Sequence, residues 1–317
     1  MSVEIRDRRF VDIVGANVEY ERLAGGLLFT EGPLWDPRQE RLLFSDIPGN
    51  AIVQWSPVTG TRVFRAPSNM SNGLTWDRKG RLLCCEHATS RVTCTESDGR
   101  VTVIASEFEG KALNSPNDIV VKSDGGIYFT DPTYGRMEYY GVPREPELRV
   151  RGVYRVEPDG ARISLLADDF DQPNGLCFSA DERLLFVNDT ERMHIRVFDV
   201  AADGTLRNGR IWAELAGEGA GAPDGMKIDR QGNLYCCGPG GIHVLDPAAR
   251  VLGVIRVPCA AANFTWGDED LRSLFITATD TLFRIRVHAP GPAGYVESAR
   301  ATAGSRVPIA NPDAAGE

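Results

Sequence analysis

Six short phrases in the sequence each begin with an oxygen-bearing side chain and run on into apolar residues, as in Asn72-Gly-Leu-Thr-Trp. Oxygen ligands from Asp, Glu and Asn are those that a hard cation such as Ca²⁺ or Mg²⁺ prefers. If the six phrases converged in space, their first residues would form a cation site. These residues are Glu31, Asn72, Asn117, Asn174, Asp224 and Asn263.

Turn formation is the competing explanation for these residues. Asn-Gly and Asp-Gly are frequent turn dipeptides because both residues tolerate positive φ, so turn chemistry explains any single phrase well. Glu31 is a poor turn former, however, and it occupies the position that Asn holds elsewhere. Convergence would also crowd Glu31 and Asp224 together, and a bound cation relieves such repulsion. The set therefore favours one divalent ion, Ca²⁺ first, with Mn²⁺, Mg²⁺ or Zn²⁺ as alternatives.

The elements that would position these residues follow from the repeat itself. The phrases recur at intervals of roughly 40 to 57 residues, which is typical of a propeller blade. Within a copy, short runs of alternating apolar residues are broken by turn sequences such as Ser-Asp-Gly, and most copies hold two such pairs. The sequence thus predicts an all-β, six-bladed β-propeller with four antiparallel strands per blade.

The ends of the repeat predict how the ring closes. The sixth copy lacks a fourth strand, and the strand-like segment 18–23 could fill that place, so the N-terminal strand would close the ring and remove exposed edges. We expect residues 1–287 to form the propeller domain. Residues 288–317, rich in Ala, Gly, Pro and Ser, would be a loose or surface-draped extension. The third copy carries an insertion at 131–150, either a functional loop or a disordered surface insert.

Bulk properties exclude several classes of function. The net charge is −9 and no long basic run is present, which argues against a nucleic-acid partner. No apolar stretch approaches the roughly 20 residues of a membrane helix, and the N-terminus lacks the apolar core of a secretory signal. The seven cysteines include the adjacent pairs Cys84–Cys85 and Cys236–Cys237, which are expected to be reduced and buried in a cytoplasmic protein. The oligomeric state is left open.

Five motifs in the same order and spacing carry a family resemblance. They are Thr30-Glu-Gly-Pro-Leu-Trp-Asp36, Ser115-Pro-Asn-Asp118, Phe129-Thr-Asp-Pro-Thr-Tyr-Gly135, Gln172-Pro-Asn-Gly175 and Ala222-Pro-Asp-Gly-Met226. With them the chain resembles the senescence-marker-protein/gluconolactonase/regucalcin-like family over about residues 18–287. The third motif is similar to the bacterial gluconolactonase branch in particular.

The resemblance implies a site and an activity. Glu31, Asn174 and Asp224 would ligate the metal, and Asn117 would be a further ligand or contact substrate. Ser115 stands where some animal members have a substrate-contacting Arg, so their substrate preference does not transfer. The implied function is divalent-metal-dependent hydrolysis of a sugar lactone, a small-molecule partner from carbohydrate metabolism. A metal-dependent phosphotriesterase and a non-enzymatic binding propeller are the alternatives.

Chemical roles can be assigned from these residue types. Asp224 is the candidate general base, acting on a water that the metal acidifies, and Glu31 is mainly a structural ligand. No Gly-x-Ser-x-Gly elbow and no zinc-type histidine spacing occur, which disfavours a serine hydrolase or a zinc finger. The candidate substrate contacts are Asn72, His87, Asn117, Asp131, Tyr134 and Arg136.

Overall fold

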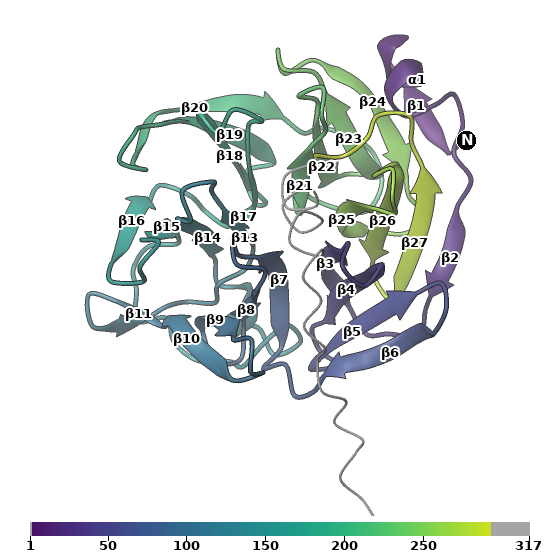
Figure 1. The fold of residues 1–317 in the computed structure, drawn as a ribbon. Coiled ribbons are helices and arrows are strands. Elements are labelled where there is room, and N and C mark those ends of the chain that lie inside the picture. The colour runs from purple at the N-terminus through teal and green to yellow at the C-terminus, as the bar shows by residue number, and fades with distance from the viewer. Residues whose placement is uncertain (1, 293–317) are drawn as a thin grey trace, which may run out of the picture.

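The chain folds into six antiparallel sheets, five of four strands and one of five, arranged around a central axis (Figure 1). This computed structural model describes residues 2–292. The predicted all-β, six-bladed propeller is confirmed. Only one short α-helix and one 3-10 turn interrupt the strands of the described part.

The first strand of each blade faces its counterparts in the neighbouring blades, so these six strands form the innermost ring. Each begins within two residues of the start of one of the six phrases noted in the sequence, which brings the first residues of the phrases toward one another. The strands are β3 (Thr30–Asp36), β7 (Ser71–Trp76), β13 (Ile119–Val121), β17 (Pro173–Phe178), β21 (Met226–Ile228) and β25 (Ala261–Gly267).

The remaining strands extend each blade outward in chain order. Blades 1 and 2 continue with β4 (Arg41–Asp46), β5 (Ala51–Ser56) and β6 (Gly60–Arg65), and with β8 (Leu82–Glu86), β9 (Arg91–Thr95) and β10 (Val101–Ala105). Blades 3 and 4 continue with β14 (Ile127–Asp131), β15 (Gly152–Val156) and β16 (Ile163–Ala167), and with β18 (Leu184–Asp189), β19 (His194–Val200) and β20 (Leu206–Glu214). Blades 5 and 6 continue with β22 (Leu234–Gly238), β23 (Gly241–Leu245) and β24 (Val251–Arg256), and with β26 (Ser273–Ala278) and β27 (Thr281–Arg286).

The hydrophobic core lies between adjacent blades, because each sheet is covered on both faces. The inner and middle strands are therefore buried almost throughout; all five residues of β8 and of β22 are buried, for example. Aromatic rings join the blades across these interfaces. Trp35 of blade 1 stacks on Phe275 of blade 6, with ring centroids 5.4 Å apart. The outer strands, such as β6 and β20, are largely exposed.

The N-terminal segment closes the ring, as predicted, and does more. Strand β2 (Glu21–Ala24) pairs antiparallel with β27 as the fourth strand of blade 6. Upstream of it, β1 (Val3–Ile5) adds a fifth strand to blade 5 by pairing with β24, and α1 (Arg9–Ile13) buries Phe10 completely. The sequence did not predict β1 or α1, because neither belongs to the repeat.

The predicted C-terminal extension begins as an ordered segment. The backbone N–H groups of His288 and Ala289 both donate to the carbonyl of Ile13, and Ala289 is fully buried. The rest of the extension, 293–317, lies outside the described residues. Across residues 2–292 no helix is long and apolar enough to cross a lipid bilayer.

The insertion in blade 3 is a structured loop between β14 and β15. It contains the 3-10 turn η1 (Tyr134–Arg136), and it reaches across to blade 1, where the Tyr139 hydroxyl donates to the carbonyl of Leu28 at 3.0 Å. A small hairpin of β11 (Glu107–Phe108) and β12 (Lys111–Ala112) precedes blade 3.

Candidate functional site

A cavity of about 200 Å³ lies at the starting ends of the innermost strands. Five of the six phrase-initial residues line it, so the predicted convergence of the ring holds in space. Asn263, the sixth, lies behind the cavity wall in contact with Glu31. The complete lining is Phe29, Glu31, Ile47, Asn72, His87, Asn117, Tyr134, Tyr140, Asn174, Thr190, Glu191 and Asp224.

Glu31 is a buried carboxylate held by two donors. Its Oε2 accepts the backbone N–H of Gly32 at 2.5 Å and the side-chain Nδ2 of Asn263 at 3.0 Å. Burial, together with the nearby charge of Asp118, raises the pKa of Glu31 to about 7 despite the opposing Gly32 contact. Glu31 is only 3% exposed, and the exposure it retains is compatible with its place in the cavity lining.

Asp224 lies in the same acidic environment. Burial, together with the charges of Glu31 and Asp118, raises the pKa of Asp224 well above its ordinary range. The side chain of Asn174 donates to it and opposes this shift. The Nδ2 of Asn174 also donates to Thr190 Oγ1 at 3.1 Å, which leaves the Asn174 side-chain oxygen as the atom available to a cation.

These donor atoms fit a hard cation better than zinc. Glu31 and Asp224 supply two carboxylates, and Asn117 and Asn174 add carboxamide oxygens around the same cavity. Calcium and magnesium take such oxygen sets, whereas structural zinc sites use Cys and His. Among residues 2–292, no three His, Cys, Asp or Glu side chains gather as a metal-binding group, so any ion here would depend on the Asn oxygens.

A lysine and an aspartate that the sequence analysis missed lie next to this ring. Lys227 Nζ donates to Asn263 Oδ1 at 3.1 Å, and Asn263 in turn holds Glu31. The Lys227 charge lowers the pKa of both Glu31 and Asp118, partly offsetting the effect of burial. A lysine within an innermost strand, three residues after Asp224, was the available signal. Asp118 directly follows the ring residue Asn117.

His87 lies in the cavity as a neutral imidazole. Its Nδ1 is 2.8 Å from the carbonyl of Tyr140, which can only accept, so Nδ1 carries the proton and Nε2 has the lone pair. Burial lowers the pKa of His87 to about 4, which keeps the ring uncharged at neutral pH. The Nδ2 of Asn72 lies 3.3 Å from Nε2 as a donor. Nε2 has a single lone pair, so His87 can accept a hydrogen bond from a ligand hydroxyl only if that hydroxyl displaces the Asn72 donor.

The blade 3 loop supplies one wall of the cavity. Tyr134 and Tyr140 line it from this loop, and the ring of Tyr140 packs edge-on against Phe29 with centroids 5.0 Å apart. Burial raises the pKa of Tyr134, so its side chain is a neutral phenol that can donate. Thr190 and Glu191 line the cavity beside Tyr134, and neither was predicted as a site residue.

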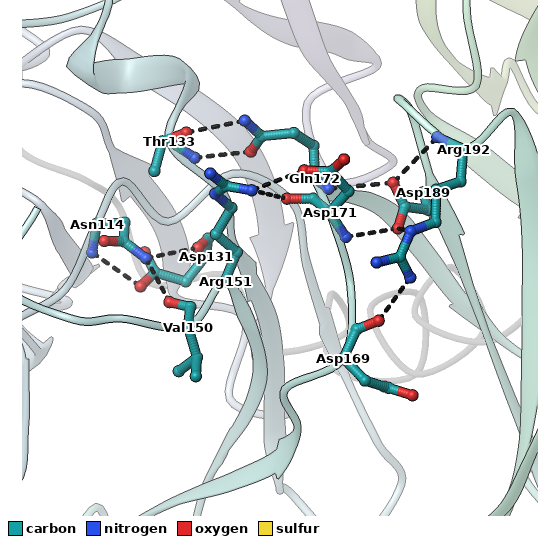
Figure 2. Close-up of polar contacts among 10 residues, drawn as sticks. All are labelled: Asn114, Asp131, Thr133, Val150, Arg151, Asp169, Asp171, Gln172, Asp189 and Arg192. Atoms are coloured by element: carbon teal, nitrogen blue, oxygen red, sulfur yellow. Dashed lines mark hydrogen bonds and ion pairs between the residues drawn. The ribbon is translucent and has the colours of Figure 1, made fainter.

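Two predicted substrate contacts lie outside the lining. Asp131 is completely buried, and its carboxylate accepts the backbone N–H group of Asn114 at 2.8 Å (Figure 2). It also accepts the backbone N–H group of Ser115 at 2.8 Å. Arg136 Nη2 donates to the carbonyl of Leu113 at 2.6 Å. Neither side chain reaches the cavity, because each is engaged by the backbone that leads into β13. The expected contacts of both residues with substrate therefore do not fit this structure.

Comparison with known proteins places this architecture in a family. The family model described as the SMP-30/gluconolactonase/LRE-like region matches residues 29–280. The chain belongs to this family. The chain is similar to the gluconolactonase of Zymomonas mobilis, which is 33% identical over 304 residues, covering 88% of this chain and 84% of that protein. The rabbit (Oryctolagus cuniculus) regucalcin is 27% identical over 252 residues, 78% of this chain and 82% of its own length.

A solved structure agrees in fold and sequence. A gluconolactonase from Xanthomonas campestris superposes with a TM-score of 0.84 at 33% identity, covering 90% of this chain and 95% of that chain. The resemblance noted in the sequence is confirmed, and the chain is a gluconolactonase-like member of a lactone hydrolase family.

Proposed function

We propose that this chain is a divalent-metal-dependent hydrolase that opens a sugar lactone at the mouth of the propeller channel. The observation that carries the proposal is the pairing of Glu31 and Asp224 in one cavity. Burial and the charge of Asp118 raise the pKa of both carboxyl groups, and the charge of Glu31 also raises the pKa of Asp224. A dication at this point would relieve the repulsion.

Glu31, Asn117, Asn174 and Asp224 would hold the ion. Ca²⁺ suits this mixture of carboxylate and carboxamide oxygens best, and Mn²⁺, Mg²⁺ and Zn²⁺ are the ions to compare with it. When bound, the ion supplies Lewis-acid polarisation of the lactone carbonyl and stabilises the negative charge that develops on its oxygen.

The chain's own residues would orient the substrate and move the proton. Asp224 takes the proton of the attacking water as general base. A substrate hydroxyl would take the place of the Asn72 amide as donor to His87 Nε2, and the released Asn72 amide and the Tyr134 phenol can donate to other substrate oxygens. Phe29 and Tyr140 cover the apolar side of the ligand and exclude water. The site would thus recognise a small hydroxylated ring.

The proposal extends to location. All seven cysteines lie within the described residues and are free thiols, six of them buried. This state fits a reducing compartment, and we propose a cytoplasmic protein on that ground.

The direct test is acid release from glucono-1,5-lactone in a pH-stat. Protein stripped with chelator should be inactive, and return of Ca²⁺, Mn²⁺, Mg²⁺ or Zn²⁺ in turn should restore hydrolysis. Asp224→Asn should lower kcat by about 100-fold or more, as expected for loss of a general base. Asp229→Asn is the matched control, because Asp229 lies at the other end of the same strand. Undiminished hydrolysis after complete metal removal would contradict the metal dependence.

A further inference from the structure

Three blades share one device at the end of the second strand. In blade 3, Asp131 accepts two consecutive backbone N–H groups, those of Asn114 and Ser115, one on each carboxylate oxygen. In blade 4, Asp189 does the same with Asp171 at 2.7 Å and Gln172 at 3.1 Å (Figure 2).

Blade 1 uses the device in a variant form. Asp46 Oδ1 alone accepts the N–H groups of Leu28 at 3.1 Å and Phe29 at 3.0 Å. We call Asp46, Asp131 and Asp189 the strand-end aspartates. In each case the backbone they hold is the segment that enters the innermost strand of the same blade.

The held segments lead to proposed ligands. Two residues after the second bonded N–H come Glu31 in blade 1, Asn117 in blade 3 and Asn174 in blade 4. The corresponding strand ends of blades 5 and 6 are Gly238 and Ala278, which have no carboxylate. The device therefore coincides with three of the four residues proposed to hold the ion.

Blade 2 supplies an internal contrast. Its strand ends in Glu86, whose oxygens bond to the side chains of Asn69, Thr89, Arg91 and Thr93 instead of to entering backbone. The ring residue of this blade is Asn72, which lines the cavity but is not in the proposed ligand set. A carboxylate at this position thus does not by itself produce the device.

Burial makes these contacts rigid. Asp131 and Asp189 are both 0% exposed. A buried carboxylate is costly unless it is hydrogen-bonded, and a bond from N–H to a charged oxygen is stronger than a neutral one. Two such bonds from adjacent peptide groups fix the orientation of the backbone that follows, and hence the direction in which the ring side chain leaves it.

The same strand end in blade 4 also reaches the fourth proposed ligand. Asn188 Nδ2 donates to the backbone carbonyl of Asp224 at 2.5 Å. Thr190 Oγ1 donates to the carbonyl of Pro223 at 2.6 Å and accepts from Asn174. Asn188, Asp189 and Thr190 together hold the backbones before two proposed ligands, in adjacent blades.

We propose that the strand-end aspartates are positioning residues that set the ligand oxygens of Glu31, Asn117 and Asn174 for a divalent cation. This inference rests on the proposed function, since it concerns the same ion. It also explains why Asp131 is close to the ring in sequence but absent from the cavity. Its carboxylate acts through Asn117 instead of contacting substrate.

The test measures Ca²⁺ affinity by titration calorimetry on the full-length protein. Asp131→Asn and Asp189→Asn should each weaken Ca²⁺ binding by about 10- to 100-fold, because the amide NH2 group replaces one of the two accepting oxygens and faces a backbone N–H group. Asp46→Asn should bind nearly as wild type, since its single Oδ1 accepts both groups and an amide oxygen can replace it. Asp46→Ala should lose affinity.

Asp229→Asn separates positioning from stability. Asp229 is also 0% exposed and accepts the N–H groups of Gln231 at 2.8 Å and Asn233 at 2.9 Å, but at the opposite end of its strand. The Asp229→Asn substitution should lower the melting temperature without changing Ca²⁺ affinity. If Asp131→Asn and Asp189→Asn melt lower but bind Ca²⁺ as tightly as wild type, the strand-end aspartates stabilise the fold only and the inference is wrong.

Amide hydrogen exchange in chelator gives a second readout that needs no metal. Asp131→Asn should speed exchange in segment 114–117 and leave 171–174 protected, and Asp189→Asn should do the reverse. Unchanged protection in both segments would overturn the inference. A wild-type protein that binds no divalent cation would contradict the proposed function, while the exchange pattern would still decide whether the aspartates hold these segments.

Discussion

The carboxyl groups in the cavity are buried close to one another, and this environment disfavours their charged forms. Glu31 and Asp224 are acids in a buried cavity, and the third carboxylate, Asp118, raises the pKa of both. Lys227 is the opposing charge that acts on Glu31. One ammonium group opposes three carboxylates here, so proton uptake or a bound cation is needed to relieve the remaining repulsion.

The metal-free protein should therefore lose stability as pH rises. The pKa of Glu31 is raised from its ordinary value of 4.5 to about 7 in the folded chain, so the folded state binds more protons than the unfolded state between these values. The stabilising contribution is present below about pH 4.5 and is lost as pH rises through about 7. In chelator, the melting temperature should fall between pH 5 and pH 8.

Glu31→Gln is the variant that assigns this effect. The amide carries no titrating proton, so the fall in melting temperature over this pH range should be smaller than in wild type. Saturating Ca²⁺ should raise the melting temperature of wild type more at pH 8 than at pH 5, because protons compete for the same carboxylates. An unchanged pH dependence in Glu31→Gln would assign the titration to other groups.

Residue types and spacing were enough to predict the residues that line the cavity. They did not predict the buried residues that hold the backbone behind them. Glu31 stood out because it replaced Asn at a turn position, and Asp224 because it was the other acid in the series. Asp131 was expected to contact substrate, but the structure turns its side chain away from the cavity. The direction of a side chain at a strand end depends on the groups that lie next to it in the folded chain. Here they are the backbone N–H groups of Asn114 and Ser115, which no local pattern reveals.

At the level of elements, the blade 3 loop differs most from the repeat. Its greater length was visible in the sequence, but its path was not. The loop is fixed by non-local contacts: Tyr140 packs on Phe29 of blade 1 and bonds to His87 of blade 2, and Tyr139 bonds to Leu28. Strand periodicity predicts blades because each blade is local in sequence, whereas such contacts between blades depend on the closed ring.

Tyr140→Ala should raise KM for the lactone by about tenfold, equivalent to about 1.4 kcal/mol, because it removes the aromatic wall that covers the ligand. Ca²⁺ affinity should not change, since Tyr140 is not among the proposed ligands. The control is Tyr139→Ala: Tyr139 packs on Tyr140 and anchors the loop to Leu28 but does not line the cavity. Equal rises in KM for the two variants, measured by steady-state kinetics, would attribute the effect to loop position and not to the wall.

At the scale of the whole molecule, the first 24 residues join the two blades at the end of the chain. Strand β1 extends blade 5 and β2 completes blade 6, as the purple strands beside the green and yellow blades show in Figure 1. Between them, α1 packs into a core cluster that includes residues of both blades and Ala289. Closure thus uses two sheets and a helix, where the repeat predicted a single strand.

Phe10 tests whether this N-terminal segment is integral to the ring. It is fully buried in α1, and its ring lies against Gly253 of blade 5, where an added Cβ would lie 2.5 Å from Phe10 Cδ2. Phe10→Ala should lower the free energy of unfolding by about 3–5 kcal/mol, the usual cost of emptying an aromatic site in a core. Urea denaturation followed by circular dichroism measures it. Val58→Ala, at a position 91% exposed, should leave the free energy of unfolding almost unchanged.

Because α1 lies on the outer side of blades 5 and 6, we expect Ca²⁺ affinity to be retained in the folded Phe10→Ala variant. A loss below about 1 kcal/mol would mean that β1 and α1 are an accessory covering, and that β2 alone closes the propeller.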